Sequence, residues 1–122
     1  MTQATPSADQ PVVREVVLDE RFAGVKPTAR VEVRRIRMLP NHSGGLHVHN
    51  SPVFGVILAG SVIYQIEGSP ETELRAGDVF YEPEGVRIAR FDALADGVTF
   101  LGYFLLESGQ DAELTVPDKA PA

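Results

Sequence analysis

Apolar residues alternate with polar ones along most of this chain, which is the spacing of half-buried β-strands. Glycine- and proline-containing turns separate the alternating stretches. No stretch of 11 or more residues has the 3.6-residue period of an amphipathic helix. About nine short strands with no substantial helix predict an antiparallel, all-β sandwich or barrel. The expected strands are 12–18, 30–39, 46–49, 53–58, 61–67, 73–75, 79–82, 86–91 and 98–106.

The apolar residues move from one face to the other within the second expected strand. Val31 and Val33 share one face of an extended chain, whereas Ile36 and Met38 share the other. A β-bulge at residues 34–35 would explain the change, and so would a strand boundary drawn in the wrong place.

Two glycine-containing segments are expected to reverse the chain. Ala59–Gly60 is typical of a tight hairpin, with glycine at the position that needs a positive φ. A loop at 95–97 is expected to separate the last two strands. Ser51–Pro52 interrupts pairing after the histidine-containing strand, because proline has no N–H to donate.

The length and composition are those of one folded domain. The 122 residues are 43% hydrophobic, enough for a real core. We expect a flexible tail at 1–11, a single domain at 12–116 and a second tail at 117–122. Cysteine is absent, which excludes disulfides and thiolate chemistry.

The charge argues against polyanionic partners. The net charge is −6 and the basic residues form no long run, so neither nucleic acid nor an anionic membrane is an expected partner. The first ten residues lack the basic and apolar regions of a signal peptide, and no apolar run is long enough to cross a bilayer. We therefore expect a cytoplasmic protein.

The three histidines lie within eight residues, at His42, His47 and His49. On a strand, His47 and His49 point to the same side, with Cα atoms roughly 7 Å apart. Two imidazoles directed into a cavity are half of a first-row metal site. The alternative is a pair of surface histidines on an exposed strand face.

At these residues the chain resembles the cupin family of jelly-roll barrels. The first cupin motif, G-x5-H-x-H-x3,4-E-x6-G, lies over 41–60 and is matched at His47, His49 and Gly60. The second, G-x5-P-x-G-x2-H-x3-N, lies over 77–92 and is matched at Gly77, Pro83 and Gly85. The resemblance covers about 30–106, and small single-domain cupins share the short segments 45–49, 52–55, 65–68, 80–83 and 87–92.

The resemblance implies a jelly-roll β-barrel whose cavity holds a divalent metal, together with a homodimeric assembly. Unpaired edge strands such as 12–18 also favour a homodimer. The chain departs from the motifs at positions that matter for the ligand set. The glutamate falls on Val53, the third histidine on Ile88 and the final asparagine on Asp92. The usual ligand set of three histidines and one glutamate is thus reduced to two histidines.

Two residues are candidates to complete the site. Glu82 precedes Pro83 on an apolar strand, where an unpaired carboxylate is costly, so it is a candidate ligand or acid–base group. Pairing with an arginine, or exposure to water, is the alternative. His42 is a candidate ligand or general base because its Gly-Ser loop can fold back over the cavity, although such histidines are often solvated turn residues.

Four further residues are candidates for binding a substrate. Tyr64 and Gln65 are adjacent on one strand, so one of the two should face the cavity. Val53 and Ile88 replace polar motif residues with aliphatic ones and would line an apolar pocket.

Two hypotheses of function follow. The first is a small cupin enzyme that acts on a small organic molecule through a metal held by His47, His49 and Glu82 or His42. Iron and oxygenase-like chemistry are favoured, because two histidines and a carboxylate suit iron. Manganese, nickel, copper or zinc is also possible as the metal, and a metal-dependent isomerase or lyase is the alternative reaction class. The second hypothesis is a non-catalytic binding protein with an apolar pocket for a small ligand.

Overall fold

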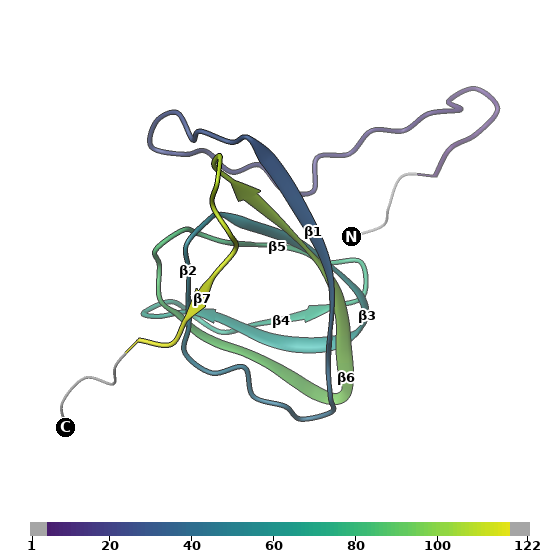
Figure 1. Cartoon of the computed structure of the whole chain (residues 1–122). Coiled ribbons are helices and arrows are strands. Elements are labelled where there is room, and N and C mark those ends of the chain that lie inside the picture. Colours follow the sequence, from purple (N-terminus) through teal and green to yellow (C-terminus); the bar gives the residue numbers. More distant parts are fainter. Residues whose placement is uncertain (1–4, 118–122) are drawn as a thin grey trace.

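The computed structural model describes residues 5–117, which form seven antiparallel β-strands and no helix. One sheet has the order β1-β6-β3-β4, with β5 also paired to β3; β2 and β7 form a second, two-stranded sheet. The strands curl around a common interior, and β2 and β7 stand across it from β1 and β6 (Figure 1). The predicted all-β, jelly-roll class is confirmed. The strand bounds are β1 Arg30–Met38, β2 Val48–His49, β3 Val53–Ile66, β4 Thr72–Arg75, β5 Val79–Glu82, β6 Ile88–Leu106 and β7 Leu114–Thr115.

Residues 5–117 contain no helix with the length and apolar character needed to traverse a membrane.

The predicted hairpin at Ala59–Gly60 is wrong, and so is the predicted loop at 95–97. Strands β3 and β6 each continue through these segments, and they stay paired with each other, with register shifts on both sides of Gly60. Gly60 and Gly97 both have positive φ and lie against each other, so two long strands bend together at this point. A glycine that allows a strand to bend has the same local signature as one that reverses the chain.

Strand β1 has no bulge, because its register with β6 is unbroken from Arg30 to Met38. Ile36 and Met38 face the interior, while Val33 is 51% exposed on the outer side. The apolar residues change face in the sequence because the first interior-facing positions of the strand are polar. There Arg34 pairs with Glu32 at 2.6 Å and lies over the ring of Phe104.

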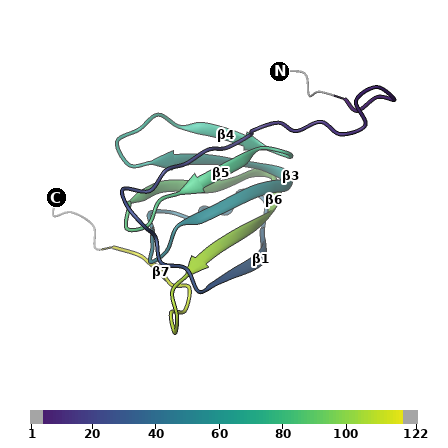
Figure 2. The same cartoon turned by 90° about the horizontal axis from the view of Figure 1, so that it is seen from above.

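The predicted strand at 12–18 is absent, since these residues have no regular structure. They form part of an extended segment that crosses above the strands near β4 and β5 (Figure 2). Val16 is 82% exposed. The valines of segment 12–18 have high strand propensity, but propensity gives a strand only where a neighbouring edge is available for pairing. Residues 1–4 and 118–122 lie outside the described part, so the limits of the two tails stay predictions.

The hydrophobic core shares the interior with the site, because several of its side chains also line the cavity beside the histidines. Aromatic side chains dominate it, and the rings of Phe80, Phe91 and Phe100 contact one another at centroid distances of 4.9–5.8 Å. A smaller cluster of Val53, Phe104 and Leu106 lies beside it. The buried members of the larger cluster are Ile57, Val62, Leu74, Phe80, Phe91, Ala93, Val98 and Phe100.

Candidate metal centre

His47 and His49 point to the same side of the chain, as the strand spacing predicts. His47 exchanges two backbone hydrogen bonds with Ile88 of β6, at 3.0 and 2.9 Å. His49 belongs to β2, opposite Leu114 of β7. Both imidazoles are buried, with 5% and 7% of each residue exposed, and their ring centroids are 5.0 Å apart. The surface-pair alternative is therefore wrong.

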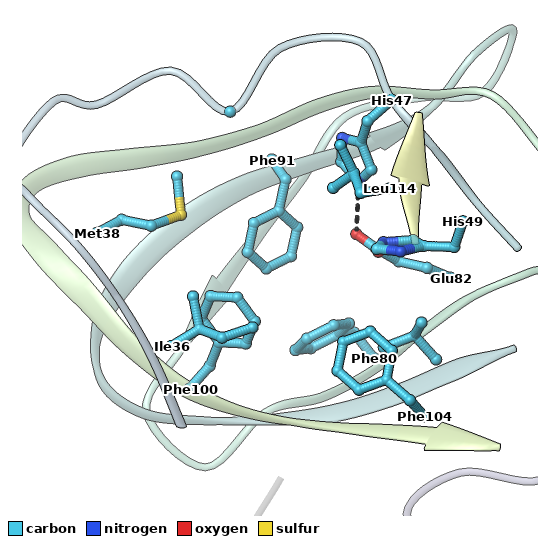
Figure 3. A pocket seen from close by; sticks show the side chains of 12 residues that line it. Ile36, Met38, His47, His49, Phe80, Glu82, Phe91, Phe100, Phe104 and Leu114 are labelled. Carbon is cyan, nitrogen blue, oxygen red and sulfur yellow. Dashed lines mark ion pairs between the residues drawn. The ribbon is translucent and has the colours of Figure 1, made fainter. Parts of the chain in front are cut away.

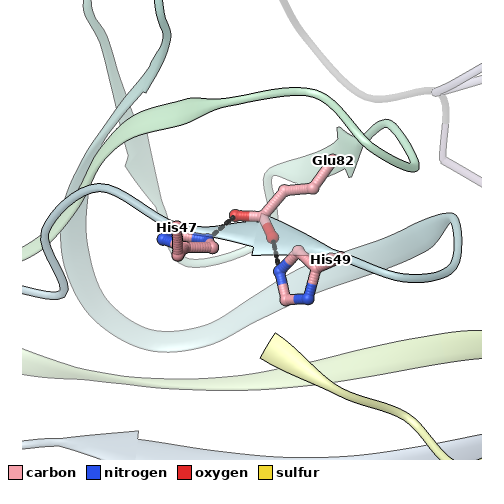
Figure 4. A group of neighbouring side chains, drawn as sticks. All are labelled: His47, His49 and Glu82. Carbon is pink, nitrogen blue, oxygen red and sulfur yellow. Dashed lines mark ion pairs between the residues drawn. The ribbon is translucent and has the colours of Figure 1, made fainter. Parts of the chain in front are cut away.

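Glu82 ends β5 and directs its carboxylate between the two imidazoles (Figure 4). Its Oε1 lies 3.5 Å from His47 Nε2, and its Oε2 contacts His49 Nε2. The residue is 4% exposed and pairs with no arginine among residues 5–117. The carboxylate thus faces both histidines.

Hydrogen bonding fixes the orientation of the His47 ring. Nδ1 lies 3.0 Å from the carbonyl oxygen of Gly45, which can only accept, so Nδ1 carries the proton and donates it. In the neutral ring this leaves the Nε2 lone pair directed at the Glu82 carboxylate. A lone pair and a carboxylate at this distance repel each other unless a cation, either a proton or a metal ion, lies between them.

The same arrangement shifts the pKa values of both partners. Burial by itself would lower the pKa of His47, but the Glu82 carboxylate and the Gly45 carbonyl outweigh it and raise that pKa above its usual value. Burial would likewise raise the pKa of Glu82, and the hydrogen bonds from His47 and His49 outweigh it and lower that pKa. The pocket therefore favours an anionic carboxylate next to a positive charge.

This donor set fits a divalent metal ion. One ligand atom from each of His47, His49 and Glu82 lies within 4.8 Å of the other two. Metal bonds of about 2.0–2.2 Å place neighbouring ligand atoms about 3 Å apart, so a small contraction brings the three onto one ion. Two imidazoles and a carboxylate on one side of an ion leave its other positions open.

Asp92 holds the loop that orients His47. Its Oδ1 accepts hydrogen bonds from Ser43 Oγ at 3.0 Å and from the backbone N–H groups of Gly44 and Gly45 at 3.1 and 3.4 Å. Its Oδ2 accepts one from Arg90 Nε at 2.8 Å. Asp92 thereby fixes the segment whose carbonyl accepts the His47 proton.

The three candidate ligands lie at one end of a cavity of about 200 Å³ (Figure 3). Among the described residues, the other side chains that line it are apolar. Leu114 pairs with His49 across β2 and β7 and is 56% exposed, which places it where the cavity meets the solvent. The lining residues are Ile36, Met38, Gly44, His47, His49, Val53, Phe80, Glu82, Phe91, Phe100, Phe104 and Leu114.

Val53 and Ile88, the aliphatic residues at the motif's polar positions, are both near the histidines. Val53 lines the cavity and is 2% exposed. Ile88 is fully buried next to His47 but is not among the lining residues.

The other three sequence candidates lie away from the cavity. His42 is exposed, and its backbone carbonyl accepts a hydrogen bond from Ala93. Tyr64 packs its ring against the core and donates its hydroxyl hydrogen to the carbonyl of Tyr81. Gln65 donates its side-chain amide to the carbonyl of Ser69. The expectation that Tyr64 or Gln65 faces the cavity is wrong, because neither lines it.

Most of the cavity wall was not predicted from the sequence. The alternation within a strand indicates which residues share a face, but Phe91, Phe100 and Phe104 read equally well as ordinary core. Leu114 belongs to a two-residue strand that has no sequence signal of its own.

Comparison with protein families finds one match over this region. The model of the family described as "Cupin domain" matches residues 34–88, which include the histidine pair and Glu82. A search of curated protein sequences found no match to this chain.

Solved structures share the fold at low sequence identity. An uncharacterised conserved protein with a double-stranded β-helix domain from Klebsiella pneumoniae is 19% identical, with a TM-score of 0.59 over 78% of this chain and 81% of that one. The DMSP lyase DddQ from Ruegeria pomeroyi is 21% identical, with a TM-score of 0.63 over 74% of this chain and 45% of the lyase.

A third structure is that of a salicylate 1,2-dioxygenase from Pseudaminobacter salicylatoxidans. It is 15% identical, with a TM-score of 0.60 over 74% of this chain and 25% of the dioxygenase. This chain therefore spans less than half the length of either named enzyme.

Proposed function

Because the chain is a small member of the cupin family, we propose that it is a metal-dependent enzyme acting on a small organic molecule. His47, His49 and Glu82 hold a divalent ion, and the cavity beside them receives the substrate. Iron is the favoured ion and dioxygen the favoured co-reactant. When bound, iron supplies coordination positions at which a substrate and dioxygen meet.

The observation that carries this proposal is the lack of any spare titratable group in the cavity. Among the described lining residues, the three candidate ligands are also the three titratable side chains. Isomerases and lyases that move protons need a positioned acid or base in addition to their metal ligands. Once the ligands are engaged, none is left here, so chemistry at the metal itself is favoured over proton transfer by the protein.

A dioxygenase reaction is consistent with such a cavity. It places both atoms of dioxygen in the product and draws its electrons from the substrate, so no separate reductant is required. The residues of this chain bind the ion, orient His47 through Gly45 and keep bulk water out with apolar walls.

Metal content and oxygen uptake test the proposal together. Untagged wild-type protein is compared with His47→Ala, Glu82→Gln and, as a matched control, His42→Ala, which removes an exposed histidine outside the cavity. We expect near-stoichiometric metal in the wild type and in His42→Ala, and a large loss in the other two variants. Iron-loaded protein should then consume oxygen with a suitable substrate.

Protein that takes up no iron, manganese, nickel, copper or zinc would overturn the metalloenzyme. The second hypothesis, a binding protein without turnover, would then apply, and the apolar walls are the observation that favours it. Stoichiometric zinc or nickel with no uptake of iron would instead favour the isomerase or lyase class.

The homodimer stays a prediction. Light scattering on the purified chain tests it, and a purely monomeric protein across the micromolar range would contradict it.

A further inference from the structure

We propose that the substrate is a small molecule with an apolar body and a single polar group, and that it carries no charge away from the metal. This inference rests on the proposed function, because it assigns the substrate class of the same cavity.

The size of the cavity limits the substrate to about one ring. Its volume is about 200 Å³. A cavity of about 150 Å³ lined by aliphatic and aromatic side chains holds a benzene molecule. The space therefore accepts a six-membered ring with one or two small substituents, or an aliphatic molecule of similar bulk.

The cavity has one polar end and apolar walls everywhere else. The imidazoles and the carboxylate cluster at one end, and the rings of Phe80, Phe91, Phe100 and Phe104 make up much of the rest (Figure 3). A ligand with one polar group directs it to the metal and buries its remaining surface against these rings. Each methylene-sized part buried in this way strengthens binding about fourfold.

The charge of the site excludes a second ionised group. No lysine or arginine is among the described residues that line the cavity. A divalent ion with one carboxylate ligand keeps one positive charge, which can neutralise at most one anionic group. A second carboxylate would lie unpaired against phenylalanine rings, where a buried charge is strongly disfavoured.

A cation that lies against one of the wall residues is already engaged. Arg34 lies over the ring of Phe104 with its guanidinium carbon 5.0 Å from the ring centroid. It pairs with Glu32 at 2.6 Å and is 46% exposed at its side chain. It does not line the cavity, so it offers no partner to an anionic group inside.

A matched pair of probes tests this directly. 4-Methylphenol and 4-hydroxybenzoate share a phenol, and they differ only in whether a methyl group or a carboxylate lies at the far end of the ring. Each is titrated by calorimetry and by NMR into the full chain loaded with redox-inert zinc. We expect 4-methylphenol to bind at least tenfold more tightly and to shift the resonances of the lining residues.

Two variants locate the binding. Ile36→Phe narrows the cavity from β1 at a residue that is not a candidate ligand, and it should weaken binding of 4-methylphenol. Val33→Phe introduces the same side chain on the outer side of the same strand and should leave binding unchanged. Equal or tighter binding of 4-hydroxybenzoate, or no binding of 4-methylphenol, would overturn the inference.

Metal content measured on the same samples separates this inference from the proposed function. Stoichiometric zinc with the wrong probe preference refutes the substrate class alone. Binding of 4-methylphenol by protein that takes up no metal refutes the proposed function, while the selection for an apolar, uncharged ligand stands.

Discussion

Val53 and Glu82 are direct antiparallel partners on β3 and β5, and both side chains line the cavity. Val53 occupies the position at which the cupin motif has its glutamate. Paired residues have Cα atoms about 4.5–5.5 Å apart and side chains on the same face. The carboxylate missing from β3 is thus supplied by the neighbouring strand, within one residue spacing of its motif position.

Exchanging these two residues should move the carboxylate and keep the site. Glu82→Val is expected to weaken metal binding by more than the roughly 10–100-fold that loss of an outer-shell partner costs. Adding Val53→Glu to that variant should recover part of the affinity, because the new carboxylate starts from the adjacent position. Metal affinity by competition with a chelator measures both variants.

The control for the exchange is Val53→Glu alone. It puts two carboxylates on one set of imidazoles and should reduce stability, since like charges in a buried site repel. No recovery in the double variant, with a native circular dichroism spectrum, would mean that the position of Glu82 cannot be replaced.

Asp92 is a positioning residue, because it acts on His47 through the loop that ends at Gly45. Asp92→Ala should lower metal affinity by about tenfold or more, the scale of an outer-shell contact. Asp92→Asn keeps an oxygen that can accept the hydrogen bonds from Ser43, Gly44 and Gly45, loses the one from Arg90, and should retain most of the affinity. Asparagine is also the residue that the cupin motif has at this position.

Asp78 provides the matched control for Asp92. Its carboxylate accepts a hydrogen bond from the backbone N–H of Arg75 at 2.8 Å and stabilises a turn away from the cavity. Asp78→Ala should lower the melting temperature without changing metal affinity. If Asp92→Ala behaves in the same way, its role is structural and the positioning argument fails.

The stabilising effect of Asp92 should depend on pH. Burial would raise the pKa of this carboxyl, but the hydrogen bonds from Arg90, Ser43 and the Gly45 backbone outweigh it and lower that pKa from its usual value of 3.8. A lowered folded-state pKa gives stability that is fully present well above pH 3.8 and is lost as the pH falls through the folded value.

Urea unfolding of the wild type and of Asp92→Asn between pH 7 and pH 3 measures this effect. The difference between their unfolding free energies should be constant above about pH 5 and should narrow below pH 3.8. A difference that is the same at pH 3 and pH 7 would show that ionisation of Asp92 does not contribute to stability.

The sequence predicted the site where local spacing determines geometry. His47 and His49 share a side because they are two residues apart on extended chain. Glu82 was recognisable as a carboxylate within an apolar strand, which requires a partner. The strand at 79–82 was predicted with its observed bounds, Val79–Glu82, because turns flank it on both sides.

Features that depend on distant contacts were not predictable in this way. His42 is five residues from His47, but the backbone hydrogen bond from Ala93 holds its segment on the outside. Tyr64 packs against Phe80 and Phe91 in the core and does not line the cavity. The core and the cavity share one interior, so the alternation along a strand cannot tell which of the two an inward side chain reaches. Leu114 reaches the cavity only because β7 pairs with β2.

The bend at Gly60 explains why two long strands were mistaken for four short ones, and it can be tested by substitution. Gly60 has a φ of 77°, and a Cβ there would lie 2.0 Å from the carbonyl oxygen of Gly97. Gly68 has a φ of 86°, and nothing lies within 4 Å of a Cβ built on it. The two positions therefore share the backbone penalty and differ in the collision.

Gly68→Ala should cost about 1–2 kcal/mol, the penalty for a side chain in a left-handed conformation. Gly60→Ala should cost a further 1–3 kcal/mol or so, because two paired strands must separate to admit the methyl group. Urea unfolding followed by far-ultraviolet circular dichroism measures both. Equal losses of unfolding free energy in the two variants would mean that β3 and β6 separate at the bend without strain. The close approach of Gly60 to Gly97 would then not be what holds the two strands together at the bend.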